Sequence, residues 1–206
     1  YAAIENKISL NPILNAFQWV VNTYSVPHDL IETFMNSMEM DLDKKVYDKE
    51  TYEKYILGSA EVVGLMCLKI FVGGDETEYE RLKMNAMKLG SAFQKINFLR
   101  DLNDDFNELG RTYFPGINMN DFNNIVKKEI EADIEEDFKL GYEGILMLPK
   151  QARFGVYMAY KYYFKLFKKI KRTKAERILE ERVRIPNRKK ARILVTSYVR
   201  HNLNML

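Results

Sequence analysis

The sequence predicts an all-α protein that folds as a single helical bundle. Apolar residues recur at intervals of three and four along nearly all of its 206 residues, which is the period of an amphipathic helix. No segment shows the alternation of apolar and polar residues that is typical of a strand. Only 10 glycines and 5 prolines interrupt the pattern, and 47% of the residues are hydrophobic. We therefore expect one domain, residues 1–206, with a substantial core.

Prolines and glycines mark the expected helix boundaries in the first half of the chain. The Asn-Pro pair at residues 11–12 is a typical helix start, and the apolar period then continues to Tyr24. Pro27 opens a second, shorter helix. Residues 48–72 predict one long, mostly apolar helix, and residues 77–109 predict another, each followed by glycine.

The second half of the chain also predicts helices. Residues 120–147 form an acidic amphipathic pattern. Its acids at 129–137 are spread around the helix, so we expect a solvated face rather than a metal site. Pro149 starts a helix of small and aromatic residues, and Pro186 precedes a last helix over 188–203.

The segment 94–105 carries the most informative chemistry. Side chains four residues apart lie above one another on a helix, so Asn97, Asp101 and Asp105 form a polar ladder. Such a ladder is often only a solvated helix face. Two carboxylates and an amide oxygen also suit Mg²⁺, which prefers oxygen ligands and is usually completed by substrate phosphates. The apolar stripe beside the ladder then favours a phosphorylated substrate with an apolar body, and the stripe is formed by Phe98, Leu102 and Phe106.

Cysteine content and hydropathy constrain the environment of the protein. Cys67 is the sole cysteine, so no disulfide can form within the chain, and we expect a reducing compartment such as the cytoplasm. We expect Cys67 itself to be packed as a small hydrophobic residue. No apolar run is long enough to span a membrane. The first residue is Tyr1 rather than methionine, which leads us to expect that the chain begins inside a longer protein.

Basic residues are concentrated near the C-terminus. The net charge is +3, but residues 161–200 hold 15 lysines and arginines against three acids, a local charge of +12. This segment favours peripheral contact with an anionic membrane at its inner face, or it is a solvated helix face. A non-enzymatic module that binds membrane or nucleic acid through this segment is an alternative, and its affinity would fall steeply with salt. We expect the acidic partner of this segment to be a membrane and not a nucleic acid.

The central segment and the residues after it resemble the second aspartate-rich motif of the squalene/phytoene synthase family. The family pattern reads Gln-x-x-Asn-x-x-Arg-Asp-x-x-x-Asp, followed by Arg-x-Tyr-x-Pro. This sequence fills every position, with Gln94, Asn97, Arg100, Asp101, Asp105, Arg111, Tyr113 and Pro115. Further segments match in the family's order, and they lie at residues 38–42, 55–64, 148–163 and 182–189.

The resemblance implies a role for each matched side chain. The Mg²⁺ ligands, with Mn²⁺ as an alternative ion, would be Asn97, Asp101 and Asp105. The substrate diphosphate would be bound by Arg100, Arg111, Tyr113 and Arg182, because guanidinium groups offer paired donors to phosphate oxygens. The catalytic residues would be Tyr55, Gln94 and Tyr163. The rings of the two tyrosines could stabilise a carbocation. The residues leaving room for polyprenyl chains would be Ser59, Ala60, Gly64 and Gly90.

The resemblance also implies a reaction. The family condenses two polyprenyl diphosphates head to head through a cyclopropyl diphosphate, and the likeness to bacterial phytoene synthases favours geranylgeranyl diphosphate and phytoene. The alternative is farnesyl diphosphate, giving squalene or dehydrosqualene, with NADPH needed only for squalene. A terpene cyclase is a further rival, and the segment 111–115 argues against it.

Two departures from the family pattern concern the first aspartate-rich motif and one glycine. No segment before Met38 supplies that upstream motif, so we expect a bundle of the isoprenoid synthase type, with a central cavity, whose N-terminal helices are missing. Glu61 stands where the family usually has glycine, and it could either narrow the cavity or point outward.

Overall fold

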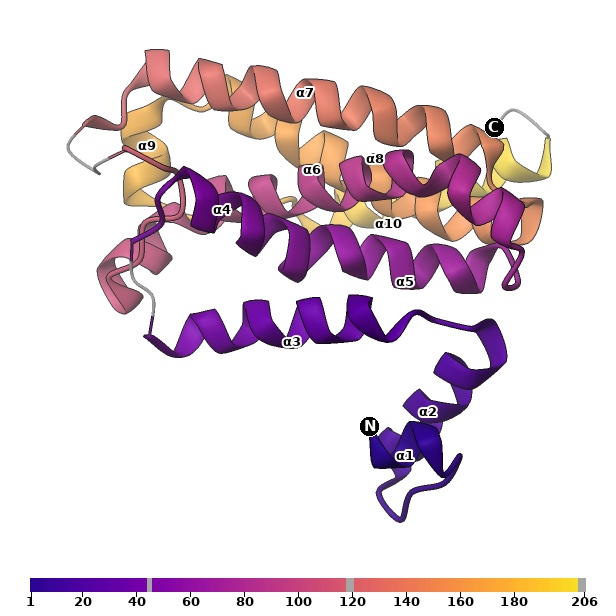
Figure 1. Ribbon diagram of the computed structural model, residues 1–206. Coiled ribbons are helices and arrows are strands. Elements are labelled where there is room, and N and C mark those ends of the chain that lie inside the picture. The colour runs from indigo at the N-terminus through magenta and orange to yellow at the C-terminus, as the bar shows by residue number, and fades with distance from the viewer. Residues whose placement is uncertain (44–45, 118–120, 204–206) are drawn as a thin grey trace.

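The protein is built from helices packed around one long central helix (Figure 1). A computed structural model describes residues 1–43, 46–117 and 121–203, and within these ranges every regular element is a helix. The helices are α1 (Ala2–Glu5), α2 (Pro12–Tyr24), α3 (His28–Asp43), α4 (Lys49–Ile56), α5 (Val62–Phe71), α6 (Glu76–Leu109), α7 (Asn124–Met147), α8 (Lys150–Arg172), α9 (Ala175–Glu180) and α10 (Asn187–Asn202). The prediction of an all-α fold is confirmed.

The helix boundaries follow the capping residues of the sequence. The Asn11 side chain accepts hydrogen bonds from the amides of Ile13 and Leu14, at 2.9 and 3.3 Å, and so caps α2. Helix α6 ends at Gly110, whose φ of 63° is a left-handed conformation that glycine adopts without strain. The helix expected over 120–147 begins at Asn124, and residue 120 lies outside the described ranges.

The single helix expected over 48–72 is interrupted. Between α4 and α5 the chain makes a π-helical turn over Leu57–Glu61. The Ser59 hydroxyl, within this turn, donates a hydrogen bond of 2.6 Å to the carbonyl of Tyr55. Periodicity alone did not reveal this turn, because one extra residue barely disturbs the apolar pattern.

Helix α6 is the axis of the bundle, and α7 packs along it in the opposite direction. Its 34 residues give it a length of about 50 Å. The antiparallel pairing follows from contacts along the two helices: the Lys95 ammonium meets Asp137, and the Asn85 side chain donates to the carbonyl of Leu140. Helices α5 and α8 pack against α6 as well.

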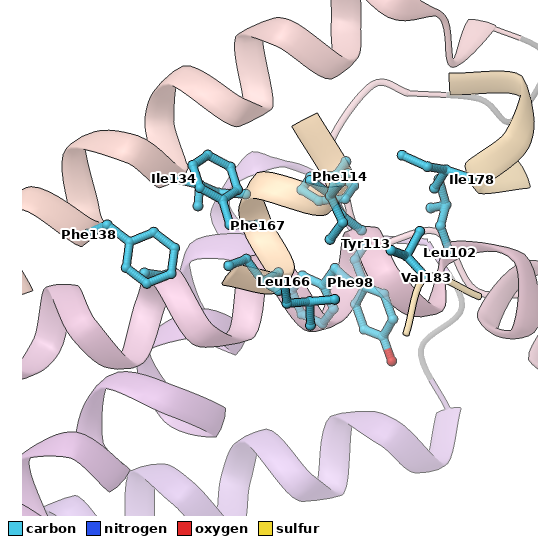
Figure 2. Close-up of a cluster of buried hydrophobic side chains, with 14 of the residues drawn as sticks. Phe98, Leu102, Tyr113, Phe114, Ile134, Phe138, Leu166, Phe167, Ile178 and Val183 are labelled. Atoms are coloured by element: carbon cyan, nitrogen blue, oxygen red, sulfur yellow. The ribbon is translucent and has the colours of Figure 1, made fainter. Parts of the chain in front are cut away.

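The main core is aromatic and lies between α6, α7 and α8 (Figure 2). In it Phe138 contacts Phe167 and Tyr160 with ring centroids 5.5 and 5.6 Å apart. At one end of this cluster the ring of Tyr113 stacks on Phe98 at 4.0 Å, and its hydroxyl lies at the cluster's edge (Figure 2). Such rings bury large apolar areas and fix the ends of α6 and α8 relative to each other.

The acids of α7 do not all lie on a solvated face, so that expectation was wrong. Asp137 is 1% exposed and Glu131 is also buried. Glu131 pairs with Lys127 one helical turn away, and Asp137 accepts from Lys95 at 2.7 Å and from Ser91 at 2.7 Å. Buried carboxylates need such partners because desolvation of an unpaired charge is costly. Asp137 therefore joins α7 to α6, whereas Glu131 is neutralised within α7.

Helices α1 and α2 form a small unit beyond one end of α3 (Figure 1). They share a separate apolar cluster with the start of α3, and its buried members are Ile4, Val21, Val26 and Ile31. The other side of α2 faces outward, where Ile13 is 76% exposed and Trp19 is also exposed. None of the helices within the described ranges is long and apolar enough to cross a membrane.

Candidate active site

The predicted ladder lies on one side of the C-terminal half of α6, and arginines surround its central acid. Arg100 donates to the two carboxylate oxygens of Asp101 at 2.9 and 2.5 Å. Arg182, from the segment after α9, approaches the same carboxylate at 2.6 Å and lies 4.0 Å from Asp104. Two of the four residues predicted to bind diphosphate therefore already gather around a predicted metal ligand.

Asp105 has a different environment from Asp101. Burial, and next the nearby Asp101 carboxylate, raise the pKa of Asp105 to about 6 from its ordinary 3.8, while Arg111 opposes the shift. Among the described residues no lysine or arginine forms an ion pair with Asp105. This carboxylate is thus partly desolvated and only partly compensated, which is typical of a group that awaits a ligand.

A chain of contacts joins the ladder to the interior of the bundle. The Tyr163 hydroxyl donates to the Asn97 side-chain oxygen at 3.4 Å, and the Asn97 amide donates to Gln94 at 3.4 Å. The ring of Tyr163 stacks on Phe93, with centroids 4.1 Å apart. The predicted catalytic residues Gln94 and Tyr163 therefore meet the predicted metal ligand Asn97 on one side of α6.

A second polar cluster lies beyond the ladder, around Asp41 at the end of α3. The Tyr55 hydroxyl donates to the Asp41 carboxylate at 3.0 Å. Arg111 donates to the other carboxylate oxygen at 3.4 Å and to the Asp41 carbonyl at 2.5 Å, and it lies 3.4 Å from the Tyr113 hydroxyl. Burial, and then the neighbouring Tyr113 and Asp41, raise the pKa of Tyr55, so its phenol stays protonated.

The rings of this cluster pack against one another. Tyr47 lies 5.2 Å from Tyr55 and 5.1 Å from Tyr113, measured between ring centroids. A short parallel bridge between Val46 and Thr112 brings the two loops together and so sets this arrangement. The result is a wall of tyrosine rings next to the end of the ladder.

An apolar cavity of about 430 Å³ runs along α6 from Gln94 toward Leu82. The twelve helical steps from Leu82 to Gln94 give it a length of about 18 Å. Its walls come from the π turn, α5, α7 and α8, and polar side chains are few. The four residues predicted to line a cavity all belong to this wall, and they are Ser59, Ala60, Gly64 and Gly90.

Two of these wall residues also determine how closely the helices approach. A Cβ atom on Gly90 would lie 2.5 Å from the carbonyl oxygen of Ala60, and one on Gly64 would lie 2.7 Å from that of Ala86. Both contacts are to backbone, which cannot move aside cheaply. Glycine at these positions therefore permits the close crossing of α6 with α5 and the π turn, in addition to sparing space in the wall.

Glu61 and Cys67 differ in their relation to the cavity. Glu61 is absent from the cavity wall and half-buried, and burial raises the pKa of its carboxyl while Lys88 opposes the rise. Cys67 is half-buried and part of the wall, so it is not simply packed in the core as we expected. Burial raises the pKa of its thiol, which keeps this part of the cavity uncharged.

The structure brings the predicted residues into two adjoining groups. Asp101 and its arginines form one, and Tyr55, Arg111 and Tyr113 form the other. Sequence reasoning missed Asp41, which joins members of the second group, although the segment 38–42 had matched the family pattern. It also missed the aromatic partners Tyr47 and Phe93, which the sequence did not distinguish from other core rings.

The donor atoms of the ladder fit a magnesium ion. They are two carboxylates and an amide oxygen, and the raised pKa of Asp105 reflects first its burial and then the nearby Asp101 carboxylate. Within the described ranges no cluster of three or more His, Cys, Asp or Glu is arranged to hold a metal by itself. The ladder would therefore need further oxygen ligands, such as substrate phosphates and water.

The fold and the site together define a class of protein. An acidic helix at the mouth of an apolar cavity in an all-α bundle is the arrangement of the helical isoprenoid synthases. Two solved structures share the fold: a squalene synthase from Alicyclobacillus acidocaldarius, with a TM-score of 0.71 and 21% identity, and a dehydrosqualene synthase crystallised with a ligand, with 0.75 and 18%. The match to the squalene synthase covers 83% of this chain and 69% of the other. The match to the dehydrosqualene synthase covers 98% of this chain and 74% of the other.

The chain belongs to the squalene/phytoene synthase family, whose model matches residues 2–189. A 4,4'-diapophytoene synthase of Staphylococcus haemolyticus is 28% identical over 59% of this chain and 41% of its own length. A phytoene synthase of Pseudescherichia vulneris is 32% identical over 55% of this chain and 36% of its own length. A presqualene diphosphate synthase of Rhodopseudomonas palustris is 32% identical over 50% of this chain and 36% of its own length. The chain thus spans less than half the length of these curated relatives.

Proposed function

We propose that this chain forms the diphosphate-ionising part of a prenyltransferase that condenses two polyprenyl diphosphates head to head. The observation that carries the proposal is the meeting of the acidic ladder, its arginines and an 18 Å apolar cavity along one side of α6. A diphosphate head and a hydrocarbon tail need these two environments side by side. The names of the family relatives support the same reaction class.

The arginines would bind the diphosphate in the first stage of the reaction. Arg100 and Arg182 now pair with Asp101, and Arg111 lies beside Tyr113. Their guanidinium groups offer paired donors to phosphate oxygens and would stabilise the charge that develops as the diphosphate leaves. Asn97, Asp101 and Asp105 would hold Mg²⁺, or Mn²⁺ in its place, which supplies further neutralisation of that charge.

The cavity and the tyrosines would protect the allylic cation that remains. Its walls are almost entirely apolar, so water that would quench the cation is excluded. Tyr163 lies at the Asn97 end of the ladder, and the ring of Tyr55 lies 5.5 Å from that of Tyr113; the electron-rich faces of both tyrosines could stabilise positive charge. The double bond of the second substrate would then attack the cation and give the cyclopropyl diphosphate.

For the substrate we propose geranylgeranyl diphosphate, with phytoene as the product. The support is the family match together with relatives whose names include phytoene synthase, from Pseudescherichia vulneris and from Paracoccus. Farnesyl diphosphate is the second candidate, because other relatives are named 4,4'-diapophytoene synthase and presqualene diphosphate synthase. NADPH would be needed only if squalene were the product.

Product analysis tests the proposal. The full-length protein is incubated with geranylgeranyl or farnesyl diphosphate, each with and without NADPH, and the extracted lipids are identified by mass spectrometry. We expect a C40 hydrocarbon from geranylgeranyl diphosphate that does not depend on NADPH. A C30 hydrocarbon formed only from farnesyl diphosphate would replace phytoene with the second candidate, and release of a cyclic product from one substrate molecule would overturn the reaction class.

The same proposal includes peripheral contact with the inner face of an anionic membrane through the basic segment 161–200. Its charge of +12 complements such a surface, and substrates and products with long hydrocarbon chains partition into membranes.

A further inference from the structure

Helix α10 presents apolar side chains to the outside instead of hiding them. Its inner face is marked by Ile193 and Ser197, which are buried against the bundle. On the opposite face Val195 is 61% exposed and Tyr198 is 59% exposed, and Leu194 and Val199 are also exposed. An ordinary surface helix turns its apolar side inward, so the exposed apolar patch of α10 indicates a surface that binds an apolar partner.

The charges of α10 indicate what kind of partner fits. Between Asn187 and Asn202 there are five lysines and arginines and no acid. Arg188, Arg192, Val195 and Val199 follow one another at intervals of four, three and four, so they share one side of the helix. A side that combines cations with exposed apolar groups is typical of helices that lie in the interface of an anionic bilayer.

The same charges argue against a second copy of the chain. In a symmetric dimer the patch would face itself, and its arginines would come close to the same arginines of the other copy. Like charges that meet in an interface are unfavourable. An anionic lipid surface satisfies both the apolar and the basic residues.

A groove beneath α10 leads toward the central cavity. It has a volume of about 270 Å³ and lies between α8 and α10, lined by Met158, Ala159, Tyr162, Tyr163, Lys190 and Ile193. Ala159 is also part of the wall of the central cavity, and Tyr163 stacks on Phe93 of that wall. Ala159 of α8 therefore borders both spaces.

We propose that α10 docks the protein on an anionic membrane surface, with Val195, Tyr198 and Val199 in the interface and Arg188 and Arg192 on the lipid phosphates. The groove between α8 and α10 then opens where a hydrocarbon chain leaves the bilayer. The inference rests on the proposed function: docking narrows the membrane contact proposed for residues 161–200 to one helix, and the last step also requires the proposed reaction.

Vesicle flotation with the full chain tests docking. We expect binding to phosphatidylcholine vesicles with 30% phosphatidylglycerol to be at least roughly tenfold stronger than to phosphatidylcholine alone, and to weaken as salt is raised. Arg188→Glu with Arg192→Glu should weaken binding by at least roughly tenfold, as should Val195→Ser with Val199→Ser. Equal binding of the wild type to both vesicle types would overturn the proposal.

Helix α2 supplies the matched control, because Ile13 and Phe17 are exposed apolar residues outside any basic segment. Ile13→Ser with Phe17→Ser removes as many apolar side chains as the α10 pair and should leave binding within twofold. All variants change exposed residues, and circular dichroism verifies that they fold. If the α2 pair abolishes binding and the α10 pairs do not, the docking element is α2 and the proposal is wrong.

The single tryptophan permits a direct reading of which helix enters the lipid. Trp19 lies on α2, so its emission should not change when anionic vesicles are added. In a Trp19→Phe background, a Tyr198→Trp reporter should shift to the blue and be quenched by brominated lipids. A reporter that stays unquenched while the protein floats would contradict docking through α10.

Turnover separates this inference from the proposed function. With substrate dissolved in detergent, the α10 variants should retain wild-type rates, and with substrate in anionic vesicles they should lose at least roughly tenfold. A protein that floats normally but makes no prenyl product refutes the reaction and leaves docking intact. Equal turnover of the wild type and the variants on vesicles would refute the role of docking in substrate supply.

Discussion

Asp137 on α7 and Asp105 on α6 are both carboxylates removed from bulk water, yet their surroundings differ. Asp137 meets the ammonium groups of Lys88 and Lys95 at 3.0 and 2.7 Å and accepts from Ser91. Asp105 forms no ion pair with any lysine or arginine of the described residues, and its nearest charged neighbours include another acid. The charge of Asp137 is balanced within the protein, whereas the charge of Asp105 is only partly compensated.

The partners of Asp137 and the residues of the ladder both belong to α6, but they lie on different faces of that helix. Ser91 and Lys95 of α6 turn toward α7, and Asn97, Asp101 and Asp105 lie on another side. The balanced network fixes how α6 is rotated against α7, and that rotation aims the ladder. Incomplete pairing within the protein therefore distinguishes Asp105 from a structural acid such as Asp137.

Loss of a ladder acid should have the largest effect. Asp101→Ala and Asp105→Ala should each lower turnover of prenyl diphosphate by about 1,000-fold, or about 4 kcal/mol, because the leaving charge loses its stabilisation. Circular dichroism should show unchanged helicity. Asp104→Ala, a neighbouring acid off the ladder, is the control and should retain activity within about tenfold, and an equal loss there would remove the special role of the ladder.

Loss of the balanced acid should act on stability instead. Asp137→Ala removes the buried partner of Lys95 and leaves only the exposed Asp133 beside it, so it should lower the free energy of unfolding by about 3 kcal/mol in urea titrations. The exposed acid Glu136, next to it on α7, supplies the control, and Glu136→Ala should change stability by less than about 0.5 kcal/mol. A stable but inactive Asp137→Ala protein would reverse the comparison.

The sequence predicted the helices and the ladder because both depend on local spacing. Asn11, Gly110 and the interval of four between Asp101 and Asp105 act within one or two turns of helix. The burial of Asp137 was mispredicted because Lys95 is 42 residues away, and only the packing of α6 on α7 brings them together.

Asp41, at the candidate site, also makes contacts that local sequence patterns cannot predict. It meets Tyr55 and Arg111, which are 14 and 70 residues distant in sequence. The π turn was missed for another reason, since its hydrogen bonds leave the apolar period almost unchanged. Contacts of this kind follow from the fold and not from local pattern.

Asp41 should have an intermediate effect on catalysis. Asp41→Asn keeps an acceptor for the Tyr55 hydroxyl but removes the charge that pairs with Arg111, so we expect about a tenfold fall in kcat/KM. Asp29→Asn, an exposed acid in the first turn of the same helix, should be silent. Steady-state kinetics distinguish them, and wild-type kinetics in Asp41→Asn would show that Arg111 needs no positioning by this acid.

The raised pKa of Asp105 predicts a small, pH-dependent effect on stability. The folded state holds a proton on this carboxyl up to about pH 6, whereas the unfolded chain releases it near 3.8. Stability therefore rises as pH falls from 6 toward 4, and the cost of the ionised group is fully present above pH 6. Asp105→Asn should be more stable than the wild type by about 1 kcal/mol at pH 7.5, allowing for screening at a half-exposed group.

Thermal unfolding of both proteins from pH 4 to 8 provides the measurement. The difference in Tm between Asp105→Asn and the wild type should shrink as the pH approaches 4. A difference that is constant with pH would mean that Asp105 is an ordinary solvated acid.

The most direct test of the ladder measures pyrophosphate binding by calorimetry, with and without Mg²⁺, for the full chain and for Asp105→Asn. The account predicts binding to the wild type that requires Mg²⁺ and weakens at least tenfold in the variant. Binding that is equally strong without a divalent ion, or unchanged in Asp105→Asn, would contradict it.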